Sequence, residues 1–294
     1  MRKVFLLAIM IAITLLPGKA SAKYYSALYG TYMDYSSGNK TSGLSSSFYI
    51  SSGNIYQTTS LGISVTRAKE RNLVTSAGNG KQSSFLDTNY IDQLDFTVLY
   101  SNTGEILEKH TFSFGFHYIK TDDILTDEGK IVYFDGTYFV PYRWNVGVET
   151  VYSFYPSTDV IQVAPHMGKY FYKDENRFYT WVKSYCIFLE NSEDLSVSDS
   201  FYFSAEAGLS LYRENYDLGL TVWVGRQILT VKNSGFTVYN LSDVYKGGIT
   251  AEGGYSLNKN YRIGATISVN RFEYPDTGEN AFQTTFTTYL GYSW

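Results

Sequence analysis

The chain has 294 residues and carries 24 Lys and Arg against 28 Asp and Glu, a formal net charge of −4 at pH 7. This weakly acidic balance argues against a nucleic-acid partner, and the single cysteine, Cys186, excludes an intramolecular disulfide. Aromatic residues make up 18% of the chain, Gly is frequent and Pro is rare, a mixture that favours many strands over helices.

The chain begins with a segment typical of a signal peptide. Arg2 and Lys3 give a basic start, residues 4–16 are apolar, and Ala20-Ser21-Ala22 is a small-residue cleavage site. The apolar run is shorter than the roughly 20 residues that a membrane-spanning helix needs. The residue directly after the cleavage site is Lys23 and not Cys, which argues against a lipoprotein. We therefore expect residues 1–22 to be removed and residues 23–294 to form one domain.

The rest of the chain reads as about fourteen long β runs. Each is long enough for the 9–11 residues or so of a tilted membrane strand. Twelve strands is the alternative count, if 129–140 or another weak run is misread. A soluble β-sandwich is the alternative fold, but it does not need strands this long. The sequence thus predicts an all-β, transmembrane, antiparallel up-and-down β-barrel, with strands in the runs 24–35, 43–52, 55–67, 89–101, 105–121, 129–140, 144–156, 159–173, 177–190, 198–213, 216–230, 244–256, 260–273 and 281–294.

Breaks between the runs alternate between short and long. Outer-membrane barrels have short periplasmic turns, longer outer loops and an even strand count, so this alternation places both mature termini in the periplasm. One break, 156–158, is short where an outer loop is expected. The short breaks are 53–54, 102–104, 141–143, 174–176, 214–215 and 257–259, and the longer ones are 68–88, 122–128, 191–197, 232–243 and 275–280.

Alternation along each run also assigns side chains to a lipid face and a lumen face. On 105–121, for example, Phe114 faces lipid and His117 the lumen, whereas the first two runs and 177–190 are ambiguous. If the 156–158 turn centres between Ser157 and Thr158, Glu149 directly opposes His166. The residues that we predict to line the pore are Glu149, His166, Glu206, Lys246, Glu252 and Arg262.

The last run alternates up to the final residue. Phe282, Phe286, Leu290, Tyr292 and Trp294 share one face, and the opposite face is small and polar apart from Tyr289. In this strand the chain resembles bacterial outer-membrane β-barrel proteins, whose final strand ends in Phe or Trp. The whole layout is similar to that of monomeric fourteen-stranded porins of the outer membrane porin G type.

The resemblance implies a place in the outer membrane of a Gram-negative bacterium and a monomeric state. It also implies contact with outer-membrane lipid, lipopolysaccharide and the barrel-assembly machinery. Phe286, Leu290, Tyr292 and Trp294 would then form the assembly signal.

The lumen is where a function is expected. A barrel of about fourteen strands is wider than the eight-stranded size that side chains fill. Inward charges of both signs among Ser, Thr and Gly suit a water-filled path. We therefore expect a porin-like channel for passive diffusion of small solutes or ions. Acids outnumber bases among the predicted pore residues, which predicts a modest cation preference. The alternative is a non-conducting structural, secretion-accessory or adhesive barrel.

Enzymatic and metal chemistry find little support in the sequence. The chain has three histidines, His110, His117 and His166. The surroundings of His117 do not match the His-x-Ser-Asn-Gly type of signature that we associate with outer-membrane phospholipases, so a lipid-modifying enzyme is the least favoured class. The acidic residues of 122–128 lack the spacing of an EF-hand. We expect no catalytic residue, no cofactor and no metal site.

Overall fold

The computed structural model describes residues 23–78, 81–190, 195–239 and 243–294, and for 72–87 it describes the backbone alone. The predicted signal peptide lies outside these ranges, so its cleavage stays a prediction. Within the described ranges, no helix has both the length and the hydropathy to cross a membrane.

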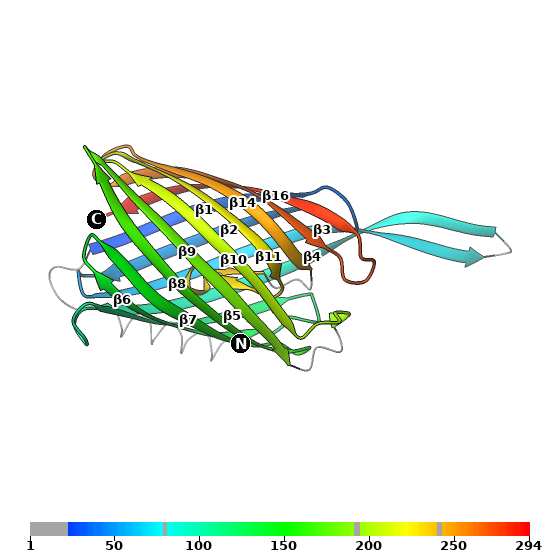
Figure 1. The fold of residues 1–294 in the computed structure, drawn as a ribbon. Coiled ribbons are helices and arrows are strands. Elements are labelled where there is room, and N and C mark those ends of the chain that lie inside the picture. The colour runs from blue at the N-terminus through cyan, green and yellow to red at the C-terminus, as the bar shows by residue number, and fades with distance from the viewer. Residues whose placement is uncertain (1–22, 79–80, 191–194, 240–242) are drawn as a thin grey trace, which may run out of the picture.

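Fourteen antiparallel strands form one closed barrel (Figure 1), which confirms the predicted fold and strand count. Neighbours in the sheet are neighbours in sequence with two exceptions: the pair of β1 and β16, and the pair of β11 and β14. The connection between β11 and β14 contains the short strands β12 (Val231–Lys232) and β13 (Thr237–Val238). The barrel strands are β1 (Lys23–Tyr35), β2 (Lys40–Gly53), β3 (Gln57–Gly78), β4 (Lys81–Thr103), β5 (His110–Thr121), β6 (Lys130–Val140), β7 (Trp144–Phe154), β8 (Asp159–Lys173), β9 (Asn176–Glu190), β10 (Phe201–Tyr212), β11 (Tyr216–Gln227), β14 (Val244–Ser256), β15 (Tyr261–Glu273) and β16 (Asn280–Ser293).

The barrel closes between its first and last strands. β1 pairs with β16 from Tyr25 opposite Ser293 to Tyr35 opposite Gln283. This pairing removes both sheet edges, which a strand in lipid cannot leave unpaired. We call the end of the barrel that holds Lys23 and Ser293 the terminal end, and the opposite end the loop end.

The largest difference from the predicted boundaries is in β3 and β4. The run 68–88 was expected to be an outer loop, but both strands continue through it and pair as far as Gly78 opposite Lys81. Beyond the pair of Arg71 and Thr88 these strands pair only with each other, so the hairpin projects past the rim (Figure 1).

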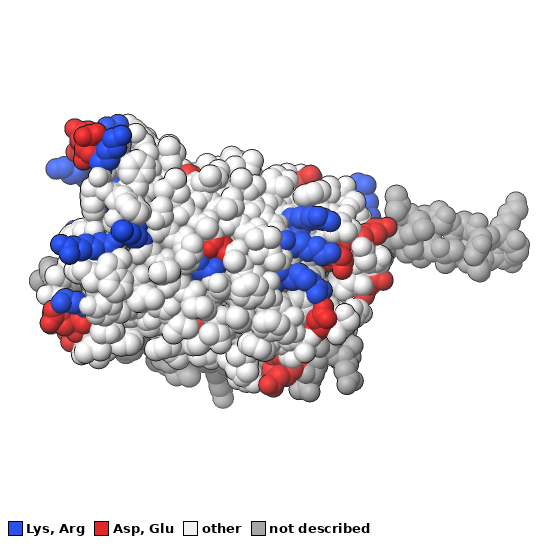
Figure 2. Space-filling model, viewed as in Figure 1, with Lys and Arg blue, Asp and Glu red and all other residues white. Residues whose placement is uncertain are grey.

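The outer surface carries the predicted apolar face. Phe114, Phe203 and Leu290 are each about half exposed, at 56%, 50% and 49%. Charged side chains gather at the two ends of the barrel and leave a mostly uncharged band between them on the face in Figure 2. An apolar band of this kind matches a hydrocarbon layer and would aggregate in water.

The short turn between β7 and β8 sets a register that differs from the predicted one. The Tyr155 N–H donates to the Thr158 carbonyl at 3.0 Å, so the turn centres between Pro156 and Ser157. Glu149 therefore opposes Ala164, and His166 opposes Gly147. The predicted pairing of Glu149 with His166 is wrong by two residues, because the tight turn begins one residue earlier than we assumed.

The inner surface is less polar than predicted. Toward the loop end, inner side chains of β5 to β10 join a buried apolar cluster that includes Ile119, Ile131, Val160, Ile187 and Tyr202. Apolar side chains facing a water-filled channel would be costly. Another part of the chain covers them, and it comes from the connection between β11 and β14.

Candidate functional site: a partly filled lumen

Residues 228–239, which we call the inward segment, fold back into the barrel from the loop end. Ile228, Leu229 and Val231 are at most 1% exposed and belong to the apolar cluster on the inner wall. Gln162 of β8 fixes the segment with two hydrogen bonds: its Nε2 donates to the Val231 carbonyl at 2.8 Å, and its Oε1 accepts from the Val231 N–H at 3.0 Å. We had predicted an outer loop from residue 232, and the described part of that range is instead largely inside the lumen.

Lys232 anchors the inward segment electrostatically. Its Nζ lies 2.5 Å from Oε2 of Glu206 on β10, and both side chains are almost fully buried. The same Nζ lies 4.9 to 5.8 Å from the ring centroids of Trp223, Tyr185 and Tyr239, within cation–π range. Burial lowers the pKa of Lys232, although Glu206 opposes this shift. The lysine is thus held by one carboxylate and three rings.

The tip of the inward segment crosses toward the opposite wall. Asn233, Ser234 and Gly235 all have positive φ, which turns the chain sharply within three residues. Phe236 then packs edge-on against Tyr49 of β2, with the ring centroids 5.3 Å apart. A Cβ at Gly62 of β3 would lie 2.9 Å from the Phe236 ring, so the glycine makes room for it. The segment therefore bridges the lumen.

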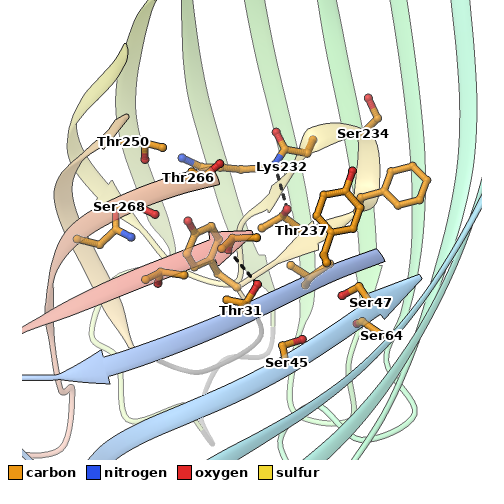
Figure 3. Close-up of a pocket in the computed structure, with 18 of the residues that line it drawn as sticks. Thr31, Ser45, Ser47, Ser64, Lys232, Ser234, Thr237, Thr250, Thr266 and Ser268 are labelled. Carbon is orange, nitrogen blue, oxygen red and sulfur yellow. Dashed lines mark hydrogen bonds between the residues drawn. The ribbon is translucent and has the colours of Figure 1, made fainter. Parts of the chain in front are cut away.

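A cavity of about 960 Å³ remains beside the inward segment. Hydroxyl groups line much of it: in Figure 3, Ser45, Ser47 and Ser64 lie on one side and Thr250, Thr266 and Ser268 on the other. Lys232, Ser234 and Thr237 of the inward segment lie beside them. Such a lining can exchange hydrogen bonds with water or with a polar solute.

Aromatic rings on the inner wall cover glycines on neighbouring strands. Gly208 of β10 directly opposes Trp181 of β9, and the indole occupies the space that a Cβ at Gly208 would take. Tyr289 covers Gly264 in the same way on β16 and β15. The rings therefore lie close to the wall instead of standing into the lumen, which keeps the cavity wide.

Four of the six predicted pore residues, Glu149, His166, Glu206 and Glu252, line the cavity. Lys246 and Arg262 are not among the residues that line it. Lys246 lies in a β-bulge of β14 and forms an ion pair with Glu273. Arg262 forms an ion pair with Asp217 and donates to the Tyr289 hydroxyl at 3.0 Å.

The cavity charges are largely matched in pairs. Glu149 is paired with Lys183 and Glu206 with Lys232. Glu252 differs, because among the described residues no cation lies within 4.0 Å of its carboxylate. Its negative charge is therefore not neutralised by an ion pair and can attract a passing cation.

Two of the histidines belong to polar networks on the inner wall. Nδ1 of His117 lies 2.8 Å from the Thr97 hydroxyl, and its Nε2 lies 3.3 Å from Asp95. All three residues are buried inside the barrel, with at most 8% of their surface exposed. They therefore lie away from the lipid surface, where an acyl-transfer site would meet its substrate. His110, in contrast, begins β5 at the terminal end and stacks near Phe112.

Three residues of the lumen were not predicted from the sequence as site residues: Asp135, Lys183 and Lys232. Asp135 interrupts an otherwise apolar and aromatic run, and alternation alone would have placed it inward with Tyr133 and Thr137. Lys183 lies on the run whose faces were ambiguous. For Lys232, the available signal was the apolar stretch 228–231, which is unusual for a solvated loop.

The sequence matches no protein-family model and no curated protein. Among solved structures, the toluene transporter TodX of Pseudomonas putida has a TM-score of 0.54 at 10% identity, over 94% of this chain and 90% of that chain. The toluene transporter TbuX of Ralstonia pickettii has a TM-score of 0.54 at 10% identity, over 96% and 92%. A bacterial polysaccharide outer membrane secretin has a TM-score of 0.56 at 9% identity, over 92% and 98%.

These likenesses concern the fold. They confirm that the chain has the architecture of outer-membrane β-barrel proteins, as the last strand indicated, and at such identities they do not extend to what those proteins carry.

Proposed function

We propose that the protein is a porin-like channel of the Gram-negative outer membrane, through which small polar solutes or ions diffuse passively. The observation that carries this proposal is the hydroxyl-lined cavity of about 960 Å³ inside a closed barrel with an apolar outer surface. Similarity in fold to two toluene transporters and to an outer membrane secretin supports it. Diffusion needs no catalytic group, so we expect no enzymatic activity.

Charge pairing in the cavity favours weak selectivity. Lys183 and Lys232 neutralise two acids, so a large ion preference of the kind made by rings of like charge is not expected. The unpaired Glu252 favours a modest cation preference.

Single-channel recording in a planar bilayer tests the proposal. Folded, purified protein is expected to give discrete current steps, with a reversal potential in a salt gradient that indicates weak cation preference. Folded protein that gives no steps at any salt concentration or voltage would contradict it.

A second candidate function follows from the inward segment, because this segment bridges the lumen. In this alternative the lumen is closed, and the barrel has a structural, secretion-accessory or adhesive role. Under this alternative, wild-type protein is silent and a variant lacking the inward segment conducts. The same recordings on a variant with residues 229–238 replaced by a short Gly-Ser linker distinguish the two candidates.

Processing and location are part of the proposal. Mass spectrometry of protein from outer-membrane fractions is expected to show Lys23 as the first residue. Recovery only in the soluble periplasmic fraction would contradict the membrane assignment.

A further inference from the structure

Three side chains able to bind a metal ion converge on the inner wall. They are Asp135 of β6, Glu149 of β7 and His166 of β8, and one ligand atom from each lies within 4.8 Å of the others. Each comes from the middle of a strand, and the three strands are consecutive neighbours in the barrel. The backbone ladder therefore fixes their positions, which is the arrangement that a preorganised site requires.

The strand register explains why they converge. Asp135 directly opposes Glu149, and two carboxylates so placed repel each other unless a cation is shared between them. His166 directly opposes Gly147 of β7. A Cβ at Gly147 would lie 2.7 Å from Nε2 of His166, so the absence of a side chain there lets the imidazole lie across β7 toward the carboxylates.

Two of the polar atoms in this cluster are unused. Within the described part of the chain, Oε2 of Glu149 and Nδ1 of His166 are buried and have no hydrogen-bond partner. A buried polar atom without a partner destabilises the fold, because it has lost its hydrogen bonds to water. Other contacts hold the cluster in place: Asp135 accepts from the Thr137 hydroxyl at 3.0 Å, and Lys183 donates to Oε1 of Glu149.

We propose that Asp135, Glu149 and His166 form a binding site for a divalent transition-metal ion of the Zn²⁺ class. One imidazole and two carboxylates are a three-ligand set that Zn²⁺ accepts, with its fourth position left to water. Ca²⁺ and Mg²⁺ are disfavoured because they prefer oxygen ligands, whereas one of the three ligands here is an imidazole nitrogen. Glu149 and His166 line the cavity, so the ion reaches the site from the lumen.

Lys183 is the competitor of the metal ion. Its ammonium group already neutralises Glu149 and lies in a cation–π contact with Tyr185, 5.2 Å from the ring centroid. Metal binding weakens the pair between Lys183 and Glu149, so the lysine lowers the affinity of the site. Removing this lysine is therefore expected to strengthen metal binding, an effect that a purely structural ion-pair network does not produce.

The test is calorimetric titration of ZnCl₂ into folded, detergent-solubilised protein from which any affinity tag has been removed. We expect one Zn²⁺ per barrel, and visible absorption from bound Co²⁺ at the same site. His166→Ala is expected to lower the affinity by more than about tenfold, since loss of even an outer-shell partner costs 10–100-fold. Lys183→Met is expected to raise it. His110→Ala is the matched control, because that histidine lies outside the cluster, and it is expected to leave binding unchanged.

Two results would overturn the proposal. One is the absence of Zn²⁺ binding to both wild-type and Lys183→Met protein that migrates as a folded barrel. The other is an equal loss of binding in His166→Ala and His110→Ala, which would indicate adventitious binding. Because calorimetry does not depend on conductance, this result is independent of whether the barrel conducts. If it does conduct, micromolar Zn²⁺ is also expected to reduce the current of wild type but not of His166→Ala.

Discussion

Glu252 is the residue at which we expect ion selectivity to be set. Its carboxylate lines the cavity without an ion-pair partner among the described residues, whereas Arg262 is occupied by Asp217. Glu252→Gln is expected to shift the reversal potential toward anions, with folded yield unchanged. The shift should be larger at 0.1 M than at 1 M salt, because the Debye length falls from about 10 to about 3 Å.

Glu279→Gln is the control for this prediction. Glu279 belongs to the turn between β15 and β16 and is exposed outside the cavity. A shift of equal size in both variants would mean that overall charge, and not Glu252, sets the preference.

A substitution at Gly208 tests whether the barrel requires the Trp181 ring to lie close to the wall. Any larger side chain at this position meets the indole directly. Overpacking of this kind costs about 1–3 kcal/mol, so Gly208→Ala is expected to lower the free energy of unfolding in urea titrations of the inserted barrel by that amount. Gly30→Ala is the matched control, because a Cβ at Gly30 has no atom within 4 Å. Equal stability of the two variants would contradict the role given to Gly208.

The inward segment, as an element, depends on the pair of Lys232 and Glu206. Removing one partner of a buried ion pair leaves the other charge uncompensated, at a cost of roughly 3–5 kcal/mol. Lys232→Met is therefore expected to release the segment and to increase single-channel conductance. Lys246→Met, which breaks the pair with Glu273 in the β14 bulge, is expected to leave conductance unchanged. Unchanged conductance in Lys232→Met would mean that the segment does not limit flow.

The barrel strands could be predicted from sequence because each has one apolar outer face, and alternation with a period of two reports it directly. β5 matches its predicted faces for this reason, with Phe114 on the outer surface and His117 buried inside the barrel. The extension of β3 and β4 was missed because 68–88 has no continuous alternation. The inward segment was missed because loop length indicates which end of the barrel a connection lies at, and not whether it folds into the lumen.

The site was predictable only in part, because alternation gives the face of a residue and not its partner. Glu149 and His166 were placed on the inner face, but their neighbours depend on strand register, which the β7–β8 turn sets one residue away from our assumption. Asp135 opposes Glu149 for the same kind of reason. Without the register, no reason existed to group these residues as metal ligands.

Closure of the whole barrel depends on the last residues of the chain. Trp294 exchanges backbone hydrogen bonds with Tyr24, at 3.1 and 3.2 Å, and its ring stacks on that of Tyr24 with the centroids 5.5 Å apart. Deletion of residues 290–294 is expected to reduce the fraction of heat-modifiable, folded barrel strongly while leaving signal cleavage intact. Wild-type folded yield in the truncated protein would contradict a role for this strand in assembly. Trp294→Ala alone is expected to have a smaller effect in the same assay.

The inward segment is covalently joined to the barrel at both ends, through β11 and β14. Lys232 therefore competes with a passing solute for Glu206 as a tethered group. The effective concentration of such a group at its partner is of millimolar order for a short flexible tether. A solute with the same intrinsic affinity for Glu206 as Lys232 would need to reach a similar concentration to displace it, whatever the amount of protein present. A solute small enough to pass beside the segment faces no such threshold, so this tether would separate solutes by abundance as well as by size.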